Sequence, residues 1–268
     1  MPDRWITFDG IENARDLGGL DCGGRTVRGG RLLRTALLAP ASDRDIARLS
    51  DHYGVRLVFD FRSEFETSKA PDRGLPGAEN VNLQIINTNG DLYKGMFVKE
   101  GEFVDPMQKV ADFILSPASK MLADGFYLSF VSDEYSQEQY AVFFRRILSA
   151  GCPPVLFHCS QGKDRTGLAA AFLLFALGAD RETVLEDFEE SNVSYRKVTQ
   201  GVREEVTRRG GTPEDLEVAQ GLLGVNVRWF KEALNLIDSR YGGMQAYLRD
   251  CLLLSSEDIS QLRAAYLD

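Results

Sequence analysis

The sequence has few of the side chains that hold zinc or form a disulfide framework. It contains four cysteines and two histidines in 268 residues, and no two cysteines have a Cys-x-x-Cys spacing. A structural or catalytic zinc normally needs three or four such ligands close together, and small secreted domains carry dense, paired cysteines. We therefore expect no metal, no cofactor and no disulfide framework. The cysteines are Cys22, Cys152, Cys159 and Cys251.

Positive charge is also scarce. Lysine and arginine number 31 against 40 aspartates and glutamates, which gives a formal net charge of −9. Domains that bind nucleic acid usually show a basic excess, so we expect no nucleic-acid partner. A small anionic substrate stays compatible with this charge, because distant surface charge is screened beyond about 8 Å at physiological salt.

Long apolar runs are missing as well. The longest, at residues 168–179, is about a dozen residues and is too short to cross a bilayer. The N-terminal residues include an early acid and lack the apolar core of a signal peptide. These observations predict a chain without a transmembrane segment, located by default in the cytoplasm, although non-classical secretion stays open. They do not indicate an oligomeric state.

Apolar periodicity predicts an α/β fold. Short, nearly continuous apolar runs are typical of parallel strands that are covered on both faces, and we expect strands at residues 55–61, 81–86 and 154–159. Helical spacing predicts helices at 42–53, 134–150 and 168–177, and helix starts are marked at Asp180, Thr212 and Ser255.

This order predicts a mostly parallel central sheet flanked by helices, with a helical C-terminal extension. We expect one domain over residues 1–268, with a catalytic core at 1–180 and the extension at 181–268. Residues 88–130 mix Gly, Asp and Pro with scattered large apolar side chains, and we interpret them as loops and short helices near the active site.

One segment carries recognisable chemistry: a predicted strand delivers Cys159 into a short loop, and a helix follows. The backbone N–H groups of such a loop and of the first helical turn can converge on one anion, aided by the helix dipole. Gly162 allows close approach of the backbone, and Arg165 offers a planar fork for two phosphate oxygens. The predicted phosphate-binding residues are Ser160, Gln161, Gly162, Lys163 and Thr166.

The same groups favour a thiolate at Cys159, which is the reactive form of a cysteine nucleophile. The loop therefore predicts attack on a phosphate ester, a phosphocysteine intermediate, and clamping of the phosphoryl oxygens by the N–H groups and Arg165. We expect Thr166 to hydrogen-bond the sulfur and ease its departure during hydrolysis. Inorganic phosphate would then be both product and competitive inhibitor.

The loop resembles the signature of the protein tyrosine phosphatase superfamily, and the chain resembles the bacterial tyrosine/serine and phosphoinositide phosphatases, whose loop reads HCxxGKDRTG. Further segments match that family at residues 13–19, 27–34, 60–63 with Glu66, 186–192 and 241–248. The resemblance implies the superfamily fold and hydrolysis of phosphotyrosine, with phosphoserine, phosphothreonine and phosphoinositides as further substrates.

The general acid is left open between two aspartates. Neither tryptophan has the Trp-Pro-Asp context in which better-known tyrosine phosphatases hold their acid. Asp164 lies within the loop, and Asp60 ends a strand whose carboxyl end should lie at the same edge of the sheet as Cys159. The resemblance implicates both, and we prefer Asp164. The alternative for Asp60 is a structural pairing with Arg62 or Arg34.

Other polar residues near the motif have two interpretations each. Lys163 either binds a multiply charged substrate such as a phosphoinositide or only offsets Asp164. His158 is expected to orient the loop and tune the thiolate. Asp16 is either a supporting site residue or part of a turn-stabilising pair with Arg15, and Arg62 supports Asp60.

Three other functions compete with a phosphatase. A Cys-His hydrolase is disfavoured because His158 and Cys159 are adjacent and leave a strand on opposite sides. A rhodanese-like sulfurtransferase also uses a cysteine in an anion-binding loop, but Arg165 and Thr166 after Gly-Lys-Asp suit phosphate esters better. A non-catalytic phosphate-binding module would be expected to lack Cys159 or Arg165, and both are present.

Overall fold

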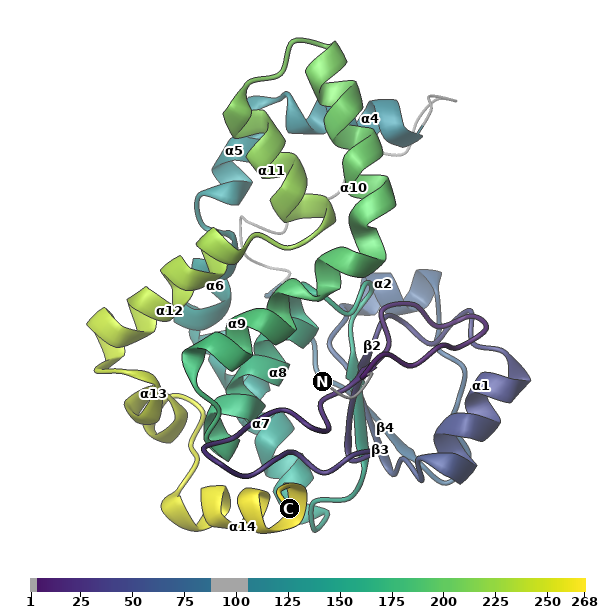
Figure 1. Ribbon diagram of the computed structural model, residues 1–268, viewed down its shortest axis with the longest axis vertical. Helices are drawn as coiled ribbons and strands as arrows, with labels where there is room; N and C mark the ends of the chain where they lie inside the picture. Colours follow the sequence, from purple (N-terminus) through teal and green to yellow (C-terminus); the bar gives the residue numbers. More distant parts are fainter. Residues whose placement is uncertain (1–3, 88–105) are drawn as a thin grey trace.

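The structure is a computed structural model that describes residues 4–87 and 106–268 (Figure 1). Its described strands form one sheet in the order β1-β2-β5-β3-β4, in which only the β1–β2 pair is antiparallel. The mostly parallel central sheet is therefore confirmed. The strands are β1 (Arg15–Asp16), β2 (Leu32–Thr35), β3 (Leu57–Asp60), β4 (Glu79–Asn82) and β5 (Val155–His158).

Alternate residues of the central strands pack on opposite faces of the sheet. Val155 and Phe157 of β5 join the larger hydrophobic core, while Leu156 between them joins a smaller one. The larger core includes helices α7 (Glu134–Ser149) and α8 (Asp164–Leu177), and the smaller one includes α1 (Asp43–Ala47) and η1 (Arg48–His52). Burial on both faces explains why these strands are apolar throughout.

Further helices occur both before α7 and after α8. In the first half, α2 (Glu64–Lys69) follows β3, and α4 (Pro106–Ile114), α5 (Pro117–Ala123) and α6 (Phe126–Ser132) precede α7. After α8 the described chain is helical to its end, which confirms the predicted extension. Its helices are α9 (Arg181–Glu189), α10 (Ser191–Arg208), α11 (Pro213–Leu223), α12 (Val227–Tyr241), α13 (Met244–Asp250) and α14 (Ser256–Tyr266).

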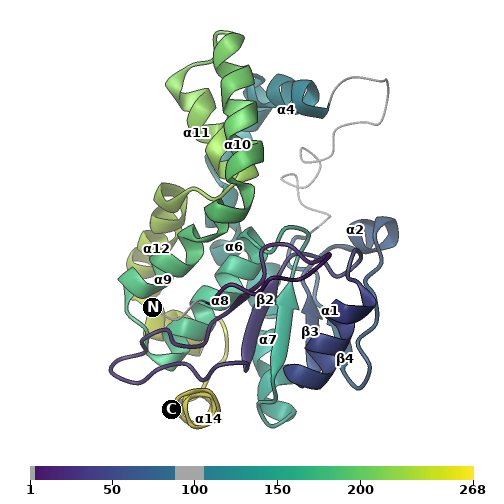
Figure 2. The same cartoon turned by 45° about the vertical axis from the view of Figure 1, so that its right-hand side comes forward.

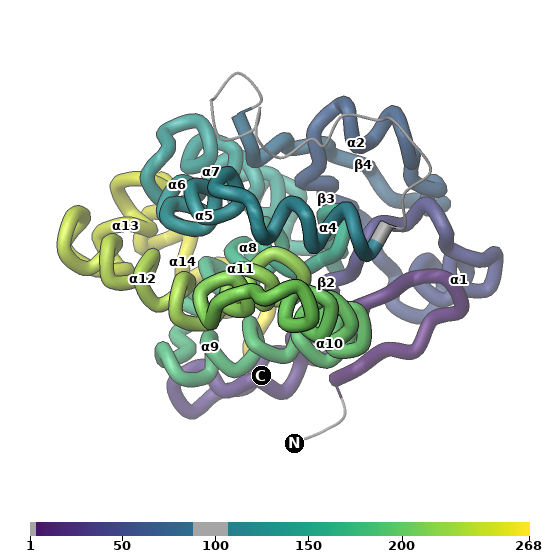
Figure 3. Tube along the Cα trace, turned by 90° about the horizontal axis from the view of Figure 1, so that it is seen from above, coloured from purple at the N-terminus to yellow at the C-terminus, as the bar shows by residue number. Residues whose placement is uncertain are grey.

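Four of these helices form a helical lobe that stands on the α/β core. Helices α4 and α5 pack against α10 and α11, so the lobe combines two distant parts of the sequence (Figure 2). Seen from above, the lobe lies over the middle of the molecule, where β2, β3 and α8 meet (Figure 3). Below it, α12 packs against α6 and connects the lobe to the core.

Most predicted boundaries agree with the structure, and two differ. The side chains of Asp180, Thr212 and Ser255 cap helices as expected. Residues 42–53 form a short α-helix followed by a π-helix. An apolar pattern cannot resolve this difference, because each of the two helices buries one apolar side chain, Ile46 and Leu49 respectively. The strand expected at 81–86 is β4 at 79–82, because the buried Leu83 and Ile85 follow the strand instead of belonging to it.

Residues 106–130 contain short helices, as the sequence predicts, while residues 88–105 lie outside the described part of the chain. Within residues 4–87 and 106–268, no helix combines the length and the apolar character needed to cross a membrane.

Candidate active site

The loop that follows β5 lies at the carboxyl edge of the sheet, in its middle. Strand β5 runs parallel to β2 and β3, and its last residue, His158, is in register with Thr35 and Asp60, the last residues of those strands. Cys159 follows directly, and α8 begins at Asp164. Ligand sites of open α/β sheets gather at this edge. The predicted strand, loop and helix are thus all present.

Carbonyl oxygens of the loop are held by side chains from outside it. Gln161 O accepts hydrogen bonds from Asn13 Nδ2 at 3.0 Å and from Tyr195 Oη at 2.6 Å. Gly162 O accepts from Asn13 Nδ2 at 3.1 Å and from Arg34 Nη2 at 3.0 Å. These contacts turn the carbonyls away from the centre of the loop, so that its N–H groups can face inward.

The N–H groups themselves have no protein acceptor. Across the described residues, none of the backbone N–H groups from 160 to 165 donates a hydrogen bond to the protein. Residues 164 and 165 also begin α8, whose first N–H groups have no partner within the helix. A set of unpaired donors at a helix start is the arrangement that binds a phosphate dianion.

Gly162 meets a steric requirement at the base of the loop. Its φ is +66°, a conformation that favours glycine, and a Cβ there would lie 2.1 Å from Thr35 O. Asn13 also has a positive φ of 49°, which asparagine tolerates better than most residues. Glycine at 162 is therefore required by the contact with β2 as well as by the turn.

Arg165 is oriented by a carboxylate that the sequence analysis did not assign to the site. Its Nη1 donates to Glu66 Oε2 at 2.7 Å and its Nη2 to Glu66 Oε1 at 2.8 Å, and Ser160 Oγ donates to Glu66 Oε1 at 2.5 Å. Burial alone would raise the pKa of Glu66, but the Arg165 guanidinium and Ser160 lower it to about 2. Glu66 is therefore ionised at every ordinary pH.

The guanidinium is buried and stays charged. Burial opposes the charge, but the neighbouring Cys159 and Glu66 outweigh it, so the pKa of Arg165 is raised above its usual value. Cys159 itself is only 2 % exposed. The structure thus brings together the sulfur, the guanidinium and the unpaired N–H groups, as the motif predicts.

Asp164 and Lys163 are held by the helical part of the chain. Tyr127 Oη of α6 donates to Asp164 Oδ1 at 2.6 Å. Lys163 Nζ donates to the carbonyl oxygens of Leu222 at 2.6 Å and Gly224 at 2.7 Å, and it lies 3.6 Å from Asp164 Oδ2. Burial lowers the pKa of Lys163. With its ammonium donating to two carbonyls, Lys163 is better placed to offset Asp164 than to bind a substrate.

Thr166 differs from its expected role. It is fully buried, yet its hydroxyl has no hydrogen-bond partner among the described residues, the sulfur of Cys159 included. The predicted hydrogen bond from Thr166 to the sulfur is therefore absent from this structure, because the hydroxyl and the sulfur do not meet in hydrogen-bonding geometry.

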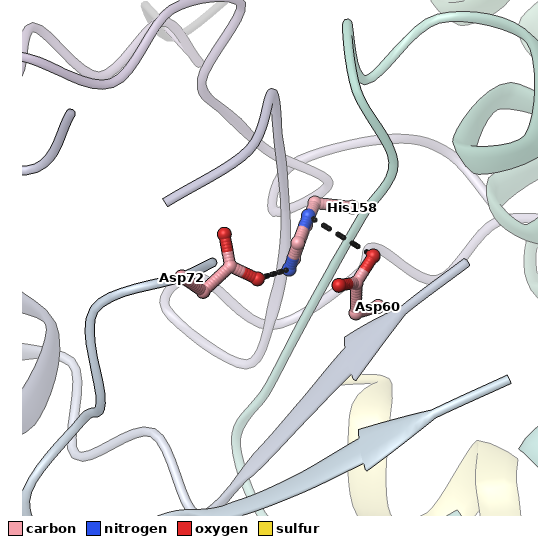
Figure 4. Close-up of side chains that lie close together, drawn as sticks. All are labelled: Asp60, Asp72 and His158. Atoms are coloured by element: carbon pink, nitrogen blue, oxygen red, sulfur yellow. Dashed lines mark ion pairs between the residues drawn. The ribbon is translucent and has the colours of Figure 1, made fainter. Parts of the chain in front are cut away.

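His158, Asp60 and Asp72 form a cluster behind the loop (Figure 4). His158 Nδ1 lies 3.2 Å from the carbonyl oxygen of Cys159, and its Nε2 lies 3.0 Å from Asp72 Oδ2. The ring therefore joins the backbone at the nucleophile to a carboxylate, a position that suits orientation of the loop. Burial would raise the pKa of Asp72, but His158 and Arg62 lower it.

Arg62 accounts for the charge of both carboxylates in this cluster. It pairs with Asp60 at 2.8 Å and with Asp72 at 2.9 Å, and both oxygens of Asp60 accept from it. The contacts of Asp60 are therefore those of the structural alternative, a pairing with Arg62. These contacts make Asp60 less suitable as the general acid than a carboxyl group that is not held by an arginine. The residue types would suit a metal ion, but Arg62 already neutralises the carboxylates, and we assign no metal site here.

Asp16 stabilises a turn. Its oxygens accept from the backbone N–H groups of Gly18 at 2.8 Å and Gly30 at 2.6 Å. Its contacts are those of the turn-stabilising alternative, although the expected partner Arg15 points elsewhere and donates to Asn13, the Asp187 carbonyl and Ser191.

A buried charge network supports the loop from the side of α9. Asp187 is 1 % exposed and pairs with Arg34 at 2.6 Å and Arg4 at 3.0 Å. Burial opposes its ionisation, but the surrounding arginines lower the pKa of Asp187 to about 2. Because Arg34 also donates to Gly162 O, Asp187 acts on the loop through that arginine.

Several supporting residues were not identified from the sequence: Asn13, Glu66, Asp72, Tyr127, Asp187 and Tyr195. Glu66 carries the one local signal that could have indicated it, since Ser63 and Glu66 form a capping box at the start of α2. Asn13, Tyr127 and Tyr195 contact the loop across 34 to 149 positions of sequence, and no local pattern predicts such contacts. Asp72 contacts His158, and Asp187 acts on the loop through Arg34.

A family model described as "Tyrosine phosphatase family" matches residues 6–268. The chain belongs to the tyrosine phosphatase family. It is a cysteine-dependent protein tyrosine phosphatase, and this membership leaves the sulfurtransferase alternative without support.

Two curated relatives span nearly the whole phosphatase. A Cupriavidus necator protein named "Putative tyrosine-protein phosphatase" is 34 % identical over 266 residues, covering 98 % of this chain and 88 % of its own. The "Triple specificity protein phosphatase PtpB" of Mycobacterium tuberculosis is 27 % identical over 292 residues, covering 100 % of this chain and 98 % of its own. The solved structure of P. aeruginosa TpbA covers 74 % of this chain and 90 % of its own at 18 % identity and a TM-score of 0.35, too low to bear on the fold.

Proposed function

We propose that this phosphatase hydrolyses phosphotyrosine in proteins, with phosphoserine and phosphothreonine as further substrates, through a phosphocysteine on Cys159. The observation that carries the proposal is the loop at 160–165, whose N–H groups donate to no acceptor among residues 4–87 and 106–268 and lie beside a guanidinium that Glu66 orients. A phosphoryl group satisfies those donors and the guanidinium together.

The reaction proceeds in two balanced steps. In the first, the thiolate of Cys159 attacks phosphorus, the S–P bond forms, the P–O bond to the leaving group breaks, and Asp164 gives its proton to the leaving oxygen. In the second, water attacks phosphorus and passes a proton to Asp164. The S–P bond then breaks, and inorganic phosphate and the thiolate are released.

The general acid in this proposal is Asp164 and not Asp60. Both oxygens of Asp60 accept from Arg62, and His158 lies on the other side of it. Asp164 begins α8 directly after the loop, and the side chains of the two aspartates are similarly exposed, 15 % for Asp164 and 13 % for Asp60. An acid must reach the leaving group, so the carboxylate that lies within the loop and is not paired with Arg62 is better suited.

Phosphoinositides are a weaker part of the proposal. The sequence argument for them rests on Lys163, whose ammonium donates to two backbone carbonyls. The relative from M. tuberculosis is named for triple specificity, which supports a broad substrate range in such proteins. We propose that any lipid activity of this chain depends on residues other than Lys163.

We also propose that residues 1–268 form one domain, with a core at 1–180 and an extension at 181–268. Contacts of Arg34 with Asp187 and of Lys163 with Leu222 and Gly224 join the two parts at the loop itself. A reducing cytoplasm suits the chemistry, because a thiolate nucleophile is readily oxidised elsewhere.

A substrate panel tests the function. Wild type is expected to hydrolyse 4-nitrophenyl phosphate and a phosphotyrosine peptide without added metal, and phosphate or vanadate is expected to inhibit competitively. Cys159→Ser is expected to lose all turnover, whereas Cys251→Ser, which changes a half-buried cysteine of the C-terminal extension, is expected to keep it. Turnover by Cys159→Ser, or activity that a chelator abolishes and metal restores, would refute the mechanism.

For the lipid question, the panel adds a short-chain phosphoinositide. Because Lys163 donates to backbone carbonyls, Lys163→Met is expected to lower activity on lipid and peptide alike. A selective loss of lipid activity would show that the ammonium binds substrate.

A further inference from the structure

Both carboxylate oxygens of Asp164 have a polar neighbour. Tyr127 Oη donates to Oδ1 at 2.6 Å, and Lys163 Nζ lies 3.6 Å from Oδ2. Tyr127 is 1 % exposed, and burial together with Asp164 raises its pKa well above the usual value. Its hydroxyl therefore keeps its proton and donates to Asp164 throughout the pH range in which the enzyme would work.

Lys163 is itself held by the end of α11 and by the linker that follows it. The carbonyl of Gly224 in the α11–α12 linker accepts from Lys163 Nζ at 2.7 Å, and Leu222 at the end of α11 supplies a second carbonyl at 2.6 Å. The backbone N–H of Asn226 in the same linker opposes the rise in the pKa of Tyr127. The α11–α12 linker therefore holds Lys163 and borders Tyr127, the two groups that flank the carboxylate.

The ring of Tyr127 has little freedom to move. It packs among four phenylalanines from α6, α9 and α12, three of them in edge-on geometry. Such aromatic contacts fix the ring position and so the direction of its hydroxyl. The neighbouring rings are Phe126, Phe130, Phe188 and Phe230.

We propose that Tyr127 is a positioning residue that aims the carboxyl group of Asp164 at the leaving group. The proposal rests on the function proposed above, in which Asp164 is the general acid. In this phosphatase the acid is thus fixed in the phosphate loop by the helical part of the chain, with a rigid phenol taking the place of a moving loop.

The charge environment determines the expected pH effect. Groups that interact electrostatically with Asp164 come from the loop, from α8 and from three other helices: Lys163, Arg165, Tyr127 of α6, Tyr140 of α7 and Tyr195 of α10. Of the three tyrosines, Tyr127 alone has a recorded hydrogen bond to the carboxylate. A hydrogen bond donated to a carboxylate favours the charged form of that carboxylate, so the pH profile of a variant without this hydroxyl tests whether the phenol acts on the acid.

Tyr127→Phe removes the hydroxyl and keeps the ring. For substrates whose leaving group needs a proton, such as phenyl phosphate or a phosphoserine peptide, kcat is expected to fall about 10- to 100-fold, the usual effect of one hydrogen bond to a charged group. For 4-nitrophenyl phosphate, whose leaving group departs as an anion, kcat is expected to change less than threefold. The alkaline limb of the kcat profile on phenyl phosphate should move to higher pH.

Tyr247→Phe is the matched control. Tyr247 is another fully buried phenol, and its hydroxyl donates to Val131 O at the other end of α6, 3.0 Å away. Its loss is expected to leave the dependence on leaving group and the pH profile unchanged. Asp164→Asn provides the second comparison, because Tyr127→Phe should add little once the carboxyl group is gone.

If Tyr127→Phe does not fold, incorporation of 3-fluorotyrosine at position 127 replaces it. The ring and the hydrogen bond are kept, the hydroxyl becomes a stronger donor, and the alkaline limb is expected to move to lower pH.

The outcomes separate this inference from the proposed function. If wild type turns over 4-nitrophenyl phosphate and Cys159→Ser does not, the function stands. If Tyr127→Phe then behaves as Tyr247→Phe does on every leaving group, or if its effect simply adds to that of Asp164→Asn, the positioning role is refuted.

Discussion

The contact between Glu66 and Arg165 makes a quantitative prediction about stability. Glu66 has an ordinary pKa of 4.5, and in the folded protein its pKa is about 2. Its side chain is 20 % exposed and accepts from Arg165 through both oxygens. A group whose pKa is lower in the folded state stabilises the fold above its unfolded pKa and loses that effect as the pH falls toward its folded pKa.

The magnitude follows from the two pKa values. The full contribution of Glu66 is about 3 kcal/mol, present above pH 4.5 and lost as the pH falls toward 2; about 2 kcal/mol of it is gone at pH 3. Glu66→Gln has no such titration. The variant should be less stable than wild type at pH 7, because Arg165 loses its partner, and the difference should shrink by about 2 kcal/mol at pH 3.

Urea unfolding of both proteins at pH 7 and pH 3 measures this difference. Other carboxylates with a lowered pKa, such as Asp187, titrate in both proteins and cancel. Glu64→Gln, which changes an exposed carboxylate in the same helix, should follow wild type at both values of pH. If the difference in the free energy of unfolding between Glu66→Gln and wild type is the same at pH 7 and pH 3, the assignment of Glu66 as the ionised partner of Arg165 is refuted.

Three further outcomes follow from the residues around the loop. Gly162→Ala is expected to lower kcat/KM for 4-nitrophenyl phosphate at least 100-fold, because its Cβ would lie 2.1 Å from Thr35 O. Asp187→Asn should lower the free energy of unfolding, measured with urea, by about 3 to 5 kcal/mol, since it leaves buried arginines without their carboxylate. Asn13→Ala should weaken competitive inhibition by phosphate about tenfold, and Asn13→Gly, which keeps the positive φ but not the hydrogen bonds, should do the same; full inhibition by either variant would show that the loop holds its shape alone.

Much of the fold is encoded in local patterns. The strands that meet at the loop are apolar runs buried on both faces, and helix starts carry capping residues that the structure uses, as at Thr212 and Ser255. The spacing of the motif predicts Cys159 as the nucleophile and Arg165 as the guanidinium that holds phosphate, because a loop that cradles one anion needs both within a few residues. The structure places Arg165 in the first turn of α8, directly after the loop that begins at Cys159.

The supporting contacts could not be predicted in this way. Tyr127 lies 37 positions before Asp164, and Asn13 lies 148 before Gln161, so neither contact leaves a periodic signal in the sequence. The two interpretations of Lys163 stayed open for a related reason. A lysine beside a phosphate-binding loop can contact the substrate or offset Asp164, and the carbonyls of Leu222 and Gly224 that accept its hydrogen bonds lie 59 and 61 positions away in the sequence.

The carbonyls of the loop are held in place by Asn13 and Arg34, which precede the motif in the sequence, and by Tyr195, which follows it. A growing chain that has been synthesised as far as Cys159 therefore lacks one of these three side chains. Tyr195 can contact the loop only after α10 has been synthesised and has packed against the core. We therefore expect the loop to reach its full affinity for phosphate only when segments from before and after the motif have packed around it. Turnover of a chromogenic ester is consequently a direct readout of complete folding, and a refolding time course followed by activity should lag behind one followed by helix content.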